Sequence, residues 1–192
     1  MLTVDSSLLA NSSFSGLIQD GGAGALGLVK TGAGTLRLSG ANTYRGGTTV
    51  TGGILQVSRD ANLGAASGGL TLNGGTLATT ASFDSGRTVT LAGAGQFDVA
   101  ANTELGLIGA MAGTGDLIKS GAGALRLDRA GNAYGNTRVL AGTLIGNTAS
   151  LSGDIGNAAT VVFNQAWMAV TPVRSAAWVA SMDGWSSRVV AR

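Results

Sequence analysis

Gly27-Leu28-Val29-Lys30-Thr31-Gly32-Ala33-Gly34-Thr35-Leu36-Arg37-Leu38 occurs twice in this chain of 192 residues. It returns as Gly115-Asp116-Leu117-Ile118-Lys119-Ser120-Gly121-Ala122-Gly123-Ala124-Leu125-Arg126-Leu127, so that matched positions lie 89 or 90 residues apart. Repetition at this scale indicates stacked supersecondary units rather than a single closed core. The similarity continues downstream in two further pairs of segments: Asn42-Thr43-Tyr44 with Asn132-Ala133-Tyr134, and residues 50–55 with residues 139–144.

The composition suits many short strands joined by tight turns. Glycine is frequent (33 residues) without a three-residue period, which excludes collagen, and the 44% hydrophobic content argues against a disordered chain. Short runs alternate with period 2 and are bounded by Gly, Asn or Asp, which is the pattern of β-strands. The expected strands are residues 35–38, 48–50, 54–57, 70–72, 75–77, 88–91 and 96–99, followed by those of the second copy and by residues 161–163.

These patterns predict an all-β fold, a right-handed parallel β-helix. No segment of helical length has apolar residues at helical spacing before about residue 165. Residues 2–20 are expected to form a lead-in coil. At roughly 20–25 residues per coil and about 4.8 Å between strands, residues 1–165 make about seven coils and a rod about 35 Å long.

Residue types exclude several kinds of chemistry. The chain has no His and no Cys, so Ser-His and Cys-His nucleophiles and thiolate or imidazole metal sites are absent. A net charge of +2 with scattered Lys and Arg gives no stripe for nucleic acid. Residues 22–27 fit a dinucleotide-binding glycine pattern, but no acid follows at the required distance, so this segment is expected to be a turn. We therefore predict no catalytic, cofactor or metal site.

Clustered carboxylates are the one catalytic alternative. Some β-helical enzymes cleave polysaccharides with paired acids, and two acids within about 5–10 Å on one face would favour this reading. Acids dispersed around the rod would argue against it, and single Asp residues where turns begin commonly bond their own backbone. The candidates are Asp84, Asp98, Glu104, Asp116 and Asp128.

Residues 28–57 resemble the autotransporter-associated β-strand repeat of passenger domains secreted by the Gram-negative type V route. Residues 74–79 and 97–99 resemble linking coils of those passengers, and the resemblance covers roughly residues 8–165. It implies two long repeats (about 14–57 and 104–146), display at the cell surface or release, and a C-terminal outer-membrane β-barrel in the full-length form. The repeat is scaffold, so the resemblance implies no enzymatic site and no small-molecule cofactor, and it names no surface ligand.

The repeat positions are interpreted as structural. Lys30 and Lys119 are either ligand contacts or corner residues, each with its stem over the apolar stack and its amine in water or on a nearby carbonyl. We favour the corner, and we expect the two tyrosines to pack against loops between coils. The structural set is Lys30, Gly32, Gly34, Leu36, Leu38 and Tyr44 in the first copy, and Lys119, Gly121, Gly123, Leu125, Leu127 and Tyr134 in the second.

The last residues differ in composition from the rest of the chain. All three tryptophans and the only proline lie within residues 166–192, together with one glycine of 33. Permitted codons read in another frame restore a Leu-Val-Lys-x-Gly-x-Gly motif there. We therefore place the β-helical segment at 1–165 and interpret 166–192 as a frameshifted tail outside the fold, with an atypical terminal cap as the alternative.

The function expected from these observations is a non-catalytic stalk segment of an autotransporter passenger, which supports surface display or adhesion and assists passenger folding during secretion. Two alternatives stay open: a carbohydrate-active β-helix enzyme, and a truncated remnant without function. Residues 1–5 lack the features of a signal peptide. The parent protein is expected at the cell surface or outer membrane, or in secreted form.

Overall fold

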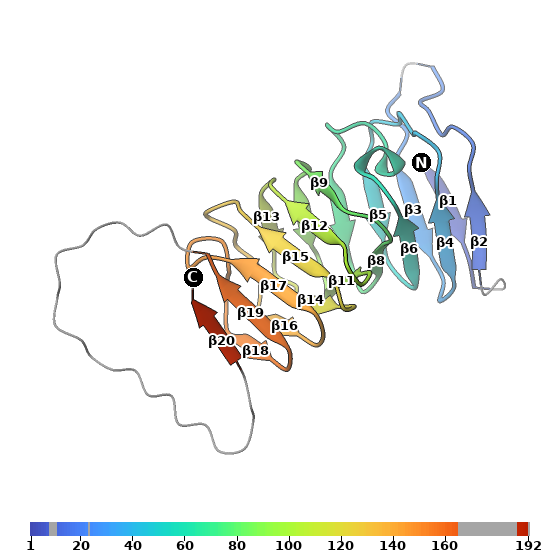
Figure 1. Cartoon of the computed structure of the whole chain (residues 1–192). Helices are drawn as coiled ribbons and strands as arrows, with labels where there is room; N and C mark the ends of the chain where they lie inside the picture. The colour runs from blue at the N-terminus through green and yellow to red at the C-terminus, as the bar shows by residue number, and fades with distance from the viewer. Residues whose placement is uncertain (8–10, 23, 165–187, 192) are drawn as a thin grey trace, which may run out of the picture.

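The computed structural model describes residues 1–7, 11–22, 24–164 and 188–191. Within these ranges the chain forms twenty strands and one short 3₁₀ helix, η1 (Asp60–Leu63), and no α-helix. All strand pairs are parallel, and the strands wind into three sheets that run along one rod (Figure 1). The predicted parallel β-solenoid is therefore confirmed.

We name the three sheets A, B and C. Sheet A contains, in spatial order, β1 (Leu2–Asp5), β3 (Leu28–Thr31), β5 (Thr48–Val50), β7 (Leu70–Leu72), β10 (Val89–Leu91) and β13 (Met111–Gly113). Sheet B contains β18 (Ile155–Asn157), β16 (Thr137–Val139), β14 (Leu117–Ser120), β11 (Gly95–Val99), β8 (Thr76–Thr79), β6 (Ile54–Val57), β4 (Thr35–Leu38) and β2 (Asn11–Phe14). Sheet C contains β20 (Arg188–Ala191), β19 (Thr160–Phe163), β17 (Thr143–Gly146), β15 (Ala124–Leu127), β12 (Glu104–Leu107) and β9 (Phe83–Ser85).

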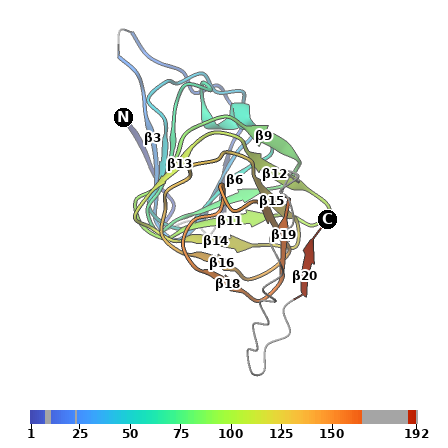
Figure 2. The same ribbon diagram turned by 90° about the vertical axis from the view of Figure 1, so that its left-hand side faces the viewer.

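The solenoid has eight coils, one for each strand of sheet B, rather than the seven expected. From the start of β2 to the start of β18 a coil averages about 21 residues, near the short end of the expected range. Seven steps of about 4.8 Å make sheet B about 34 Å long, close to the length predicted. Viewed along the rod, the coils lie over one another (Figure 2).

The core consists of inward columns in which each residue stacks on its register partner in the next coil. In sheet B, Leu36, Leu55, Leu77 and Phe97 form one such column, and all four are buried. Strand alternation turns every second residue toward this core, because successive side chains of a strand point to opposite faces. Leu, Val and a few aromatics fill the narrow interior, as the sequence pattern predicts.

Four expected strands (residues 35–38, 48–50, 54–57 and 70–72) form with the predicted bounds, and β8, β10 and β11 differ from the prediction by one or two residues at their ends. The lead-in coil contains β1 and β2, which pair with β3 and β4.

The two copies of the repeat lie on different sheets. In the first copy β3 belongs to sheet A and β4 to sheet B, whereas their counterparts β14 and β15 belong to sheets B and C. The number of strands between the two copies explains this shift. Four complete coils lead from β3 to β13, which is again in sheet A, and β14 is the next strand after β13 and so belongs to sheet B. The repeat therefore specifies a corner between two strands and leaves open which corner of the rod it occupies.

The division at residue 165 stays a prediction. Residues 165–187 and 192, which make up most of the predicted tail, lie outside the described residues. Of the rest, β20 pairs in parallel with β19 at the end of sheet C. Among the described residues there is no helix with the length and apolarity to cross a membrane.

Candidate functional site: the lysine corners of the repeat

Each repeat lysine occupies an inward position of a core column. Lys30 stacks between Val4 and Val50 in sheet A, and its side chain is fully buried. Lys119 stacks between Phe97 and Val139 in sheet B and is likewise fully buried. A buried charge needs hydrogen-bond partners, since desolvation of an unpaired ammonium is costly. The partners come from the turn that follows each lysine and from the equivalent turn of the next coil.

Three backbone carbonyl oxygens accept hydrogen bonds from each ammonium group. Lys30 Nζ donates to the carbonyls of Thr31, Gly32 and Gly52 at 2.7, 2.8 and 3.1 Å. The first two acceptors are the last residue of β3 and the first residue of the turn that leads to β4, and the third belongs to the corresponding turn of the next coil. An ammonium has three donors and no acceptor, so this arrangement uses its full capacity.

Lys119 repeats this geometry with equivalent partners. Its Nζ donates to the carbonyls of Ser120, Gly121 and Ala141 at 2.5, 2.8 and 3.2 Å. The structure thus places both lysines at corners with their amines on nearby carbonyls, one of the two placements foreseen, and neither side chain is exposed. Each lysine joins two successive turns of the solenoid.

Burial lowers the pKa of both lysines. For Lys119 the pKa falls from 10.5 to about 8, with Asp98 as a weaker opposing influence. The pKa of Lys30 is also lowered by desolvation and is raised in part by Asp5. The carbonyl acceptors favour the charged form and so oppose the effect of burial.

Glycines give the corner its shape. Gly32 and Gly121 have positive φ values of 73° and 71°, a region that side-chain-bearing residues rarely enter. Gly34 and Gly123 offer their carbonyls to the next coil, accepting from the backbone N–H groups of Ile54 and Thr143 at 3.2 and 3.1 Å. In each copy the two leucines that follow lie in the core: Leu36 and Leu38, and Leu125 and Leu127.

The tyrosines anchor the irregular segments beside the corners. The Tyr44 hydroxyl is buried and lies 2.6 Å from Thr48 Oγ1, which also donates to the carbonyl of Leu63. Desolvation raises the pKa of Tyr44. Tyr134 accepts a hydrogen bond from Thr137 at 3.3 Å, the same pairing in the second copy.

Asparagines link these segments from coil to coil. Asn42 accepts from the Ile18 N–H at 2.9 Å and donates to the Asn62 carbonyl at 2.7 Å. Asn132 does the same between Met111 and Ser150. Asn42 and Asn132 are matched positions of the repeat and were visible as such in the sequence. Their hydrogen-bond partners were not predictable, because these partners belong to neighbouring coils.

Arg87 forms a network that sequence reasoning did not predict. Its guanidinium is buried and makes a two-bond ion pair with Asp60, at 2.7 and 3.0 Å. It also donates to five backbone carbonyls, those of Asp60, Leu63, Gly64, Ala65 and Gly68. These contacts hold the segment that contains η1 onto the rod. A buried arginine is unusual, but nothing in the sequence identified its partners.

Three of the five candidate acids gather around one arginine. Arg126 donates to Glu104 at 2.7 Å and to Asp84 at 2.6 Å, and it also pairs with Asp128. The pKa of Arg126 is raised, chiefly by Glu104. Gly106 lies between Asp84 and Arg126 in the outward column, and a side chain there would collide with both.

The remaining candidate acids bind elsewhere. Asp98 accepts from the Ser120 hydroxyl at 3.0 Å, and Asp116 accepts from the Asn136 backbone N–H at 2.8 Å. In the described part of the chain, no group of three or more His, Cys, Asp or Glu residues is arranged to hold a metal ion.

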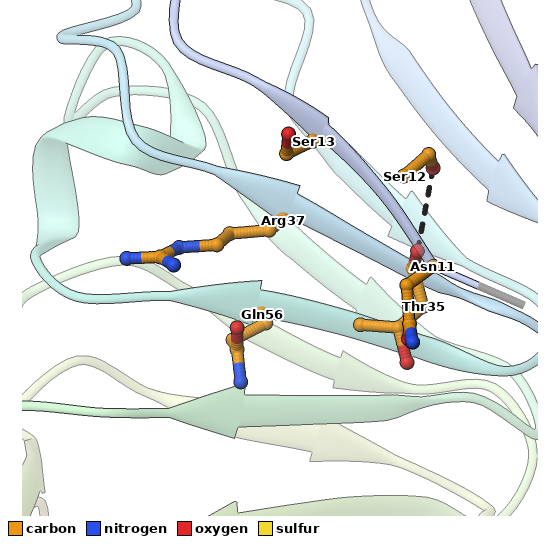
Figure 3. Close-up of a pocket in the computed structure, with 6 residues that line it drawn as sticks. All are labelled: Asn11, Ser12, Ser13, Thr35, Arg37 and Gln56. Carbon is orange, nitrogen blue, oxygen red and sulfur yellow. Dashed lines mark hydrogen bonds between the residues drawn. The ribbon is translucent and has the colours of Figure 1, made fainter.

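An open hollow lies on the outward face of sheet B near its N-terminal edge (Figure 3). It has a volume of about 400 Å³ and polar walls, with Arg37 extending along one side. No aromatic residue contributes to the lining, which therefore lacks the stacking platform that sugar rings and bases commonly use. The lining residues are Asn11, Ser12, Ser13, Thr35, Arg37 and Gln56.

Together these contacts define a repeat solenoid whose most distinctive polar residues face inward and hold its corners. Residues 28–57 and 117–145 match the model of the passenger-associated-transport-repeat family and lie within the two expected repeats. The chain thus carries two copies of this repeat and is similar to an autotransporter passenger.

One curated relative supports this similarity. Over 121 residues, 62% of this chain, the sequence is 46% identical to the adhesin BmaC autotransporter of Brucella suis biovar 1 (strain 1330). The match covers 4% of that adhesin, so the chain spans a small part of its relative's length. No solved structure matches the chain.

Proposed function

We propose that this chain is a non-catalytic stalk segment of a surface adhesin. The observation that carries the proposal is the inward orientation of the repeat lysines: their donors are used by backbone carbonyls, which leaves none for a ligand. A rod of stacked coils can hold other parts of a protein at a distance from the cell surface. The similar protein is named an adhesin. In the full-length form the segment is displayed at the cell surface by a C-terminal outer-membrane β-barrel, or is released.

The adhesive part of this proposal is tested with beads coated with the purified chain. We expect such beads to be retained on host cells or on a bacterial lawn more strongly than beads coated with an unrelated protein of equal size. Retention at the control level would remove the adhesive role. A Lys30→Met variant that keeps its fold should be retained as well as the unaltered chain, because the lysine is buried.

We also propose that the coils assist passenger folding during secretion. Each coil contacts only its neighbours, so folding can nucleate at one place and propagate along the rod. The purified chain should therefore refold unaided after dilution from urea, as followed by far-UV circular dichroism. A requirement for a chaperone would argue against this role.

A carbohydrate-active enzyme is the second candidate, and the acids around Arg126 favour it. Asp84, Glu104 and Asp128 contact one guanidinium and so lie close together on one face. The chemistry is less favourable than the geometry, since a general acid must be free to protonate the leaving group and all three carboxylates are engaged in ion pairs with Arg126. Release of reducing ends from polysaccharides, abolished by Glu104→Gln, would support this alternative and overturn the stalk.

A further inference from the structure

Among the described strands, sheet C begins later in the chain than sheets A and B. Its last strand at this end is β9, in the fourth coil, and irregular segments take the same side of the rod in the three coils before it. β9 therefore has a ladder partner, β12, on one side only. This edge is internal to the rod, because described coils lie before it, so it is independent of what precedes Met1.

The backbone of β9 directs hydrogen-bonding groups toward the preceding coil. The Ser85 carbonyl accepts from the Ile108 N–H at 3.0 Å, so Ser85 directs its backbone groups to β12. Successive residues of a strand direct these groups to opposite sides, so the N–H and C=O of Asp84 point away from β12. An edge of this kind is a template for pairing with an extended segment of another chain.

The short helix η1 lies across this edge. β6 and β8 are neighbours in register, β6 leads to η1 and β8 leads to β9, so η1 takes in its own coil the place that β9 takes in the next. The Ser85 hydroxyl donates to the carboxylate of Asp60, the first residue of η1, at 2.7 Å. A 3₁₀ helix bonds its backbone within itself and does not continue a parallel ladder. η1 therefore ends sheet C.

Two buried side chains hold residues 58–69, the segment that carries η1, in this place. Arg87 reaches back from the following coil and binds Asp60 and five carbonyls of the segment. The Asn62 amide donates to the Gly40 carbonyl of the preceding coil at 2.8 Å, and its oxygen accepts from two backbone N–H groups at the start of the segment. One guanidinium thus supplies these carbonyls with the donors that a ladder supplies elsewhere.

We propose that residues 58–69 are a cap that closes the internal edge of sheet C, and that Arg87 keeps this cap in place. When the cap is open, an extended segment of a second copy pairs with β9 where η1 lay. Second copies are the source of such segments, because their strands are extended and unpaired until each chain has folded. The cap is independent of any adhesive ligand, so its test does not depend on the stalk function.

Two variants open the cap by different routes. Arg87→Met removes the guanidinium. Gly64→Ala leaves Arg87 in place, but Gly64 has a φ of 86°, and an added Cβ would lie 2.5 Å from the Tyr44 carbonyl oxygen and 2.7 Å from its ring. Arg59→Met is the control, since Arg59 belongs to the same segment but is exposed and donates a single side-chain hydrogen bond.

Each variant is refolded from urea at high protein concentration and compared with the unaltered chain by sedimentation velocity. Both opening variants should give an oligomeric fraction about tenfold above that of the unaltered chain, because an uncovered edge pairs readily. The control should match the unaltered chain. All of these proteins share the same two ends, so association through the ends cancels in the comparison.

Position 84 shows whether β9 is the edge that pairs. Asp84→Pro removes the N–H that points to the cap, a change that an edge strand tolerates. Added to Arg87→Met, it should return the oligomeric fraction to that of the unaltered chain. Asp84→Asn is the matched control: it removes the charge that pairs with Arg126 but keeps the N–H, so Arg87→Met should stay oligomeric.

Hydrogen exchange and far-UV circular dichroism separate the outcomes. Faster exchange of residues 58–69 without oligomers would show that the edge is harmless when uncovered and would overturn the proposal. Oligomers that persist with Asp84→Pro would place the contact elsewhere, with the same consequence. If Arg87→Met loses its strand signal, Gly64→Ala decides. Loss of the signal in both variants would make the segment part of the core rather than a cap.

Discussion

At the scale of single residues, the lysine is the least expected element of the core. Hydrophobic columns ordinarily exclude an ammonium group, and here two of them are fully buried. Each is tolerated because the turn that follows it bends its carbonyls inward. The lysine thus supplies a donor to the carbonyls of the sharp corner, of which the Thr31 carbonyl also accepts from Ser6.

Replacement of either lysine by methionine should destabilise the solenoid. Methionine fills a similar volume, but three corner carbonyls lose a donor, and a buried acceptor left without any partner costs about 1–3 kcal/mol. Because removal of the buried charge offsets part of this cost, we expect a net loss of about 2 kcal/mol in the free energy of unfolding. Urea unfolding followed by circular dichroism measures it. Arg37→Met is the control, since Arg37 is exposed and should change stability by no more than about 0.5 kcal/mol.

The pH dependence of stability should carry the signature of Lys119. In the folded state its pKa is lowered to about 8, and in the unfolded chain it returns to about 10.5. Between these values the unfolded state binds more protons, so stability rises with pH, by at most about 1.4 kcal/mol per pH unit. The destabilisation caused by Lys119→Met should therefore be larger at pH 9.5 than at pH 7.5. A difference that does not change with pH would mean that the carbonyls cancel the effect of burial.

At the scale of elements, two adjacent glycines in the turn between β5 and β6, Gly52 and Gly53, differ in whether the turn would accept a side chain. Gly53 has a φ of 58°, and an added Cβ there would collide with the carbonyls of Gly32 and Gly34. At Gly52 the nearest atom to an added Cβ is the Gly32 carbonyl oxygen at 3.4 Å, an ordinary contact. The second copy already has Ala141 at the first position and Gly142 at the second.

Gly53→Ala should therefore destabilise the solenoid by more than about 2 kcal/mol, because strain and collision add. Gly52→Ala should change stability by less than about 0.5 kcal/mol. Thermal unfolding of the two variants under identical conditions makes the comparison. Equal losses would show that the turn relaxes and that its conformation does not depend on glycine.

The segment around η1 should depend on Arg87. Arg87→Met would remove one donor from the Asp60 carboxylate and from each of five carbonyls. Loss of one partner of a fully buried ion pair costs about 3–5 kcal/mol. Because Asp60 is 25% exposed and also accepts from Ser85, we expect a cost at or below the lower end of that range. We expect hydrogen exchange of residues 58–69 to accelerate more than that of any sheet. Arg59→Met is the matched control, since Arg59 donates a single side-chain hydrogen bond, to the Ser39 carbonyl. Equal acceleration in the control would contradict the role of Arg87.

The elements also show what the sequence can and cannot predict. Strands such as β4 and β6 were predictable, because period-2 alternation between glycine turns is a local signal. The corner position of Lys30 was predictable from its place before a Gly-Ala-Gly turn. The partners of Arg87 and Arg126 were not, since contacts between coils depend on the exact number of residues in every intervening turn.

At the scale of the whole molecule, the shift of the second copy by one face changes what each side of the rod displays. Residues 39–47 in the first copy and residues 58–69 just after it connect sheet B to sheet A, so they occupy the side where sheet C runs in later coils. In the second copy residues 128–136 connect sheet C to sheet B and take the side of sheet A, where Ala133 forms a bridge with Ala112. The spacing between copies therefore sets the direction in which irregular segments project.

Locality of stability follows from the same stacked arrangement. Because a coil contacts only its neighbours, damage at one corner should stay near that corner rather than unfold the whole rod. Hydrogen exchange of Lys30→Met should accelerate in β3 to β6 and leave β14 to β17 protected, and Lys119→Met should show the reverse. The two variants serve as controls for each other, since they remove the same contacts at different coils. Uniform acceleration along all three sheets in both variants would mean that the eight coils unfold as one cooperative unit. Each lysine would then contribute to the free energy of unfolding of the whole rod.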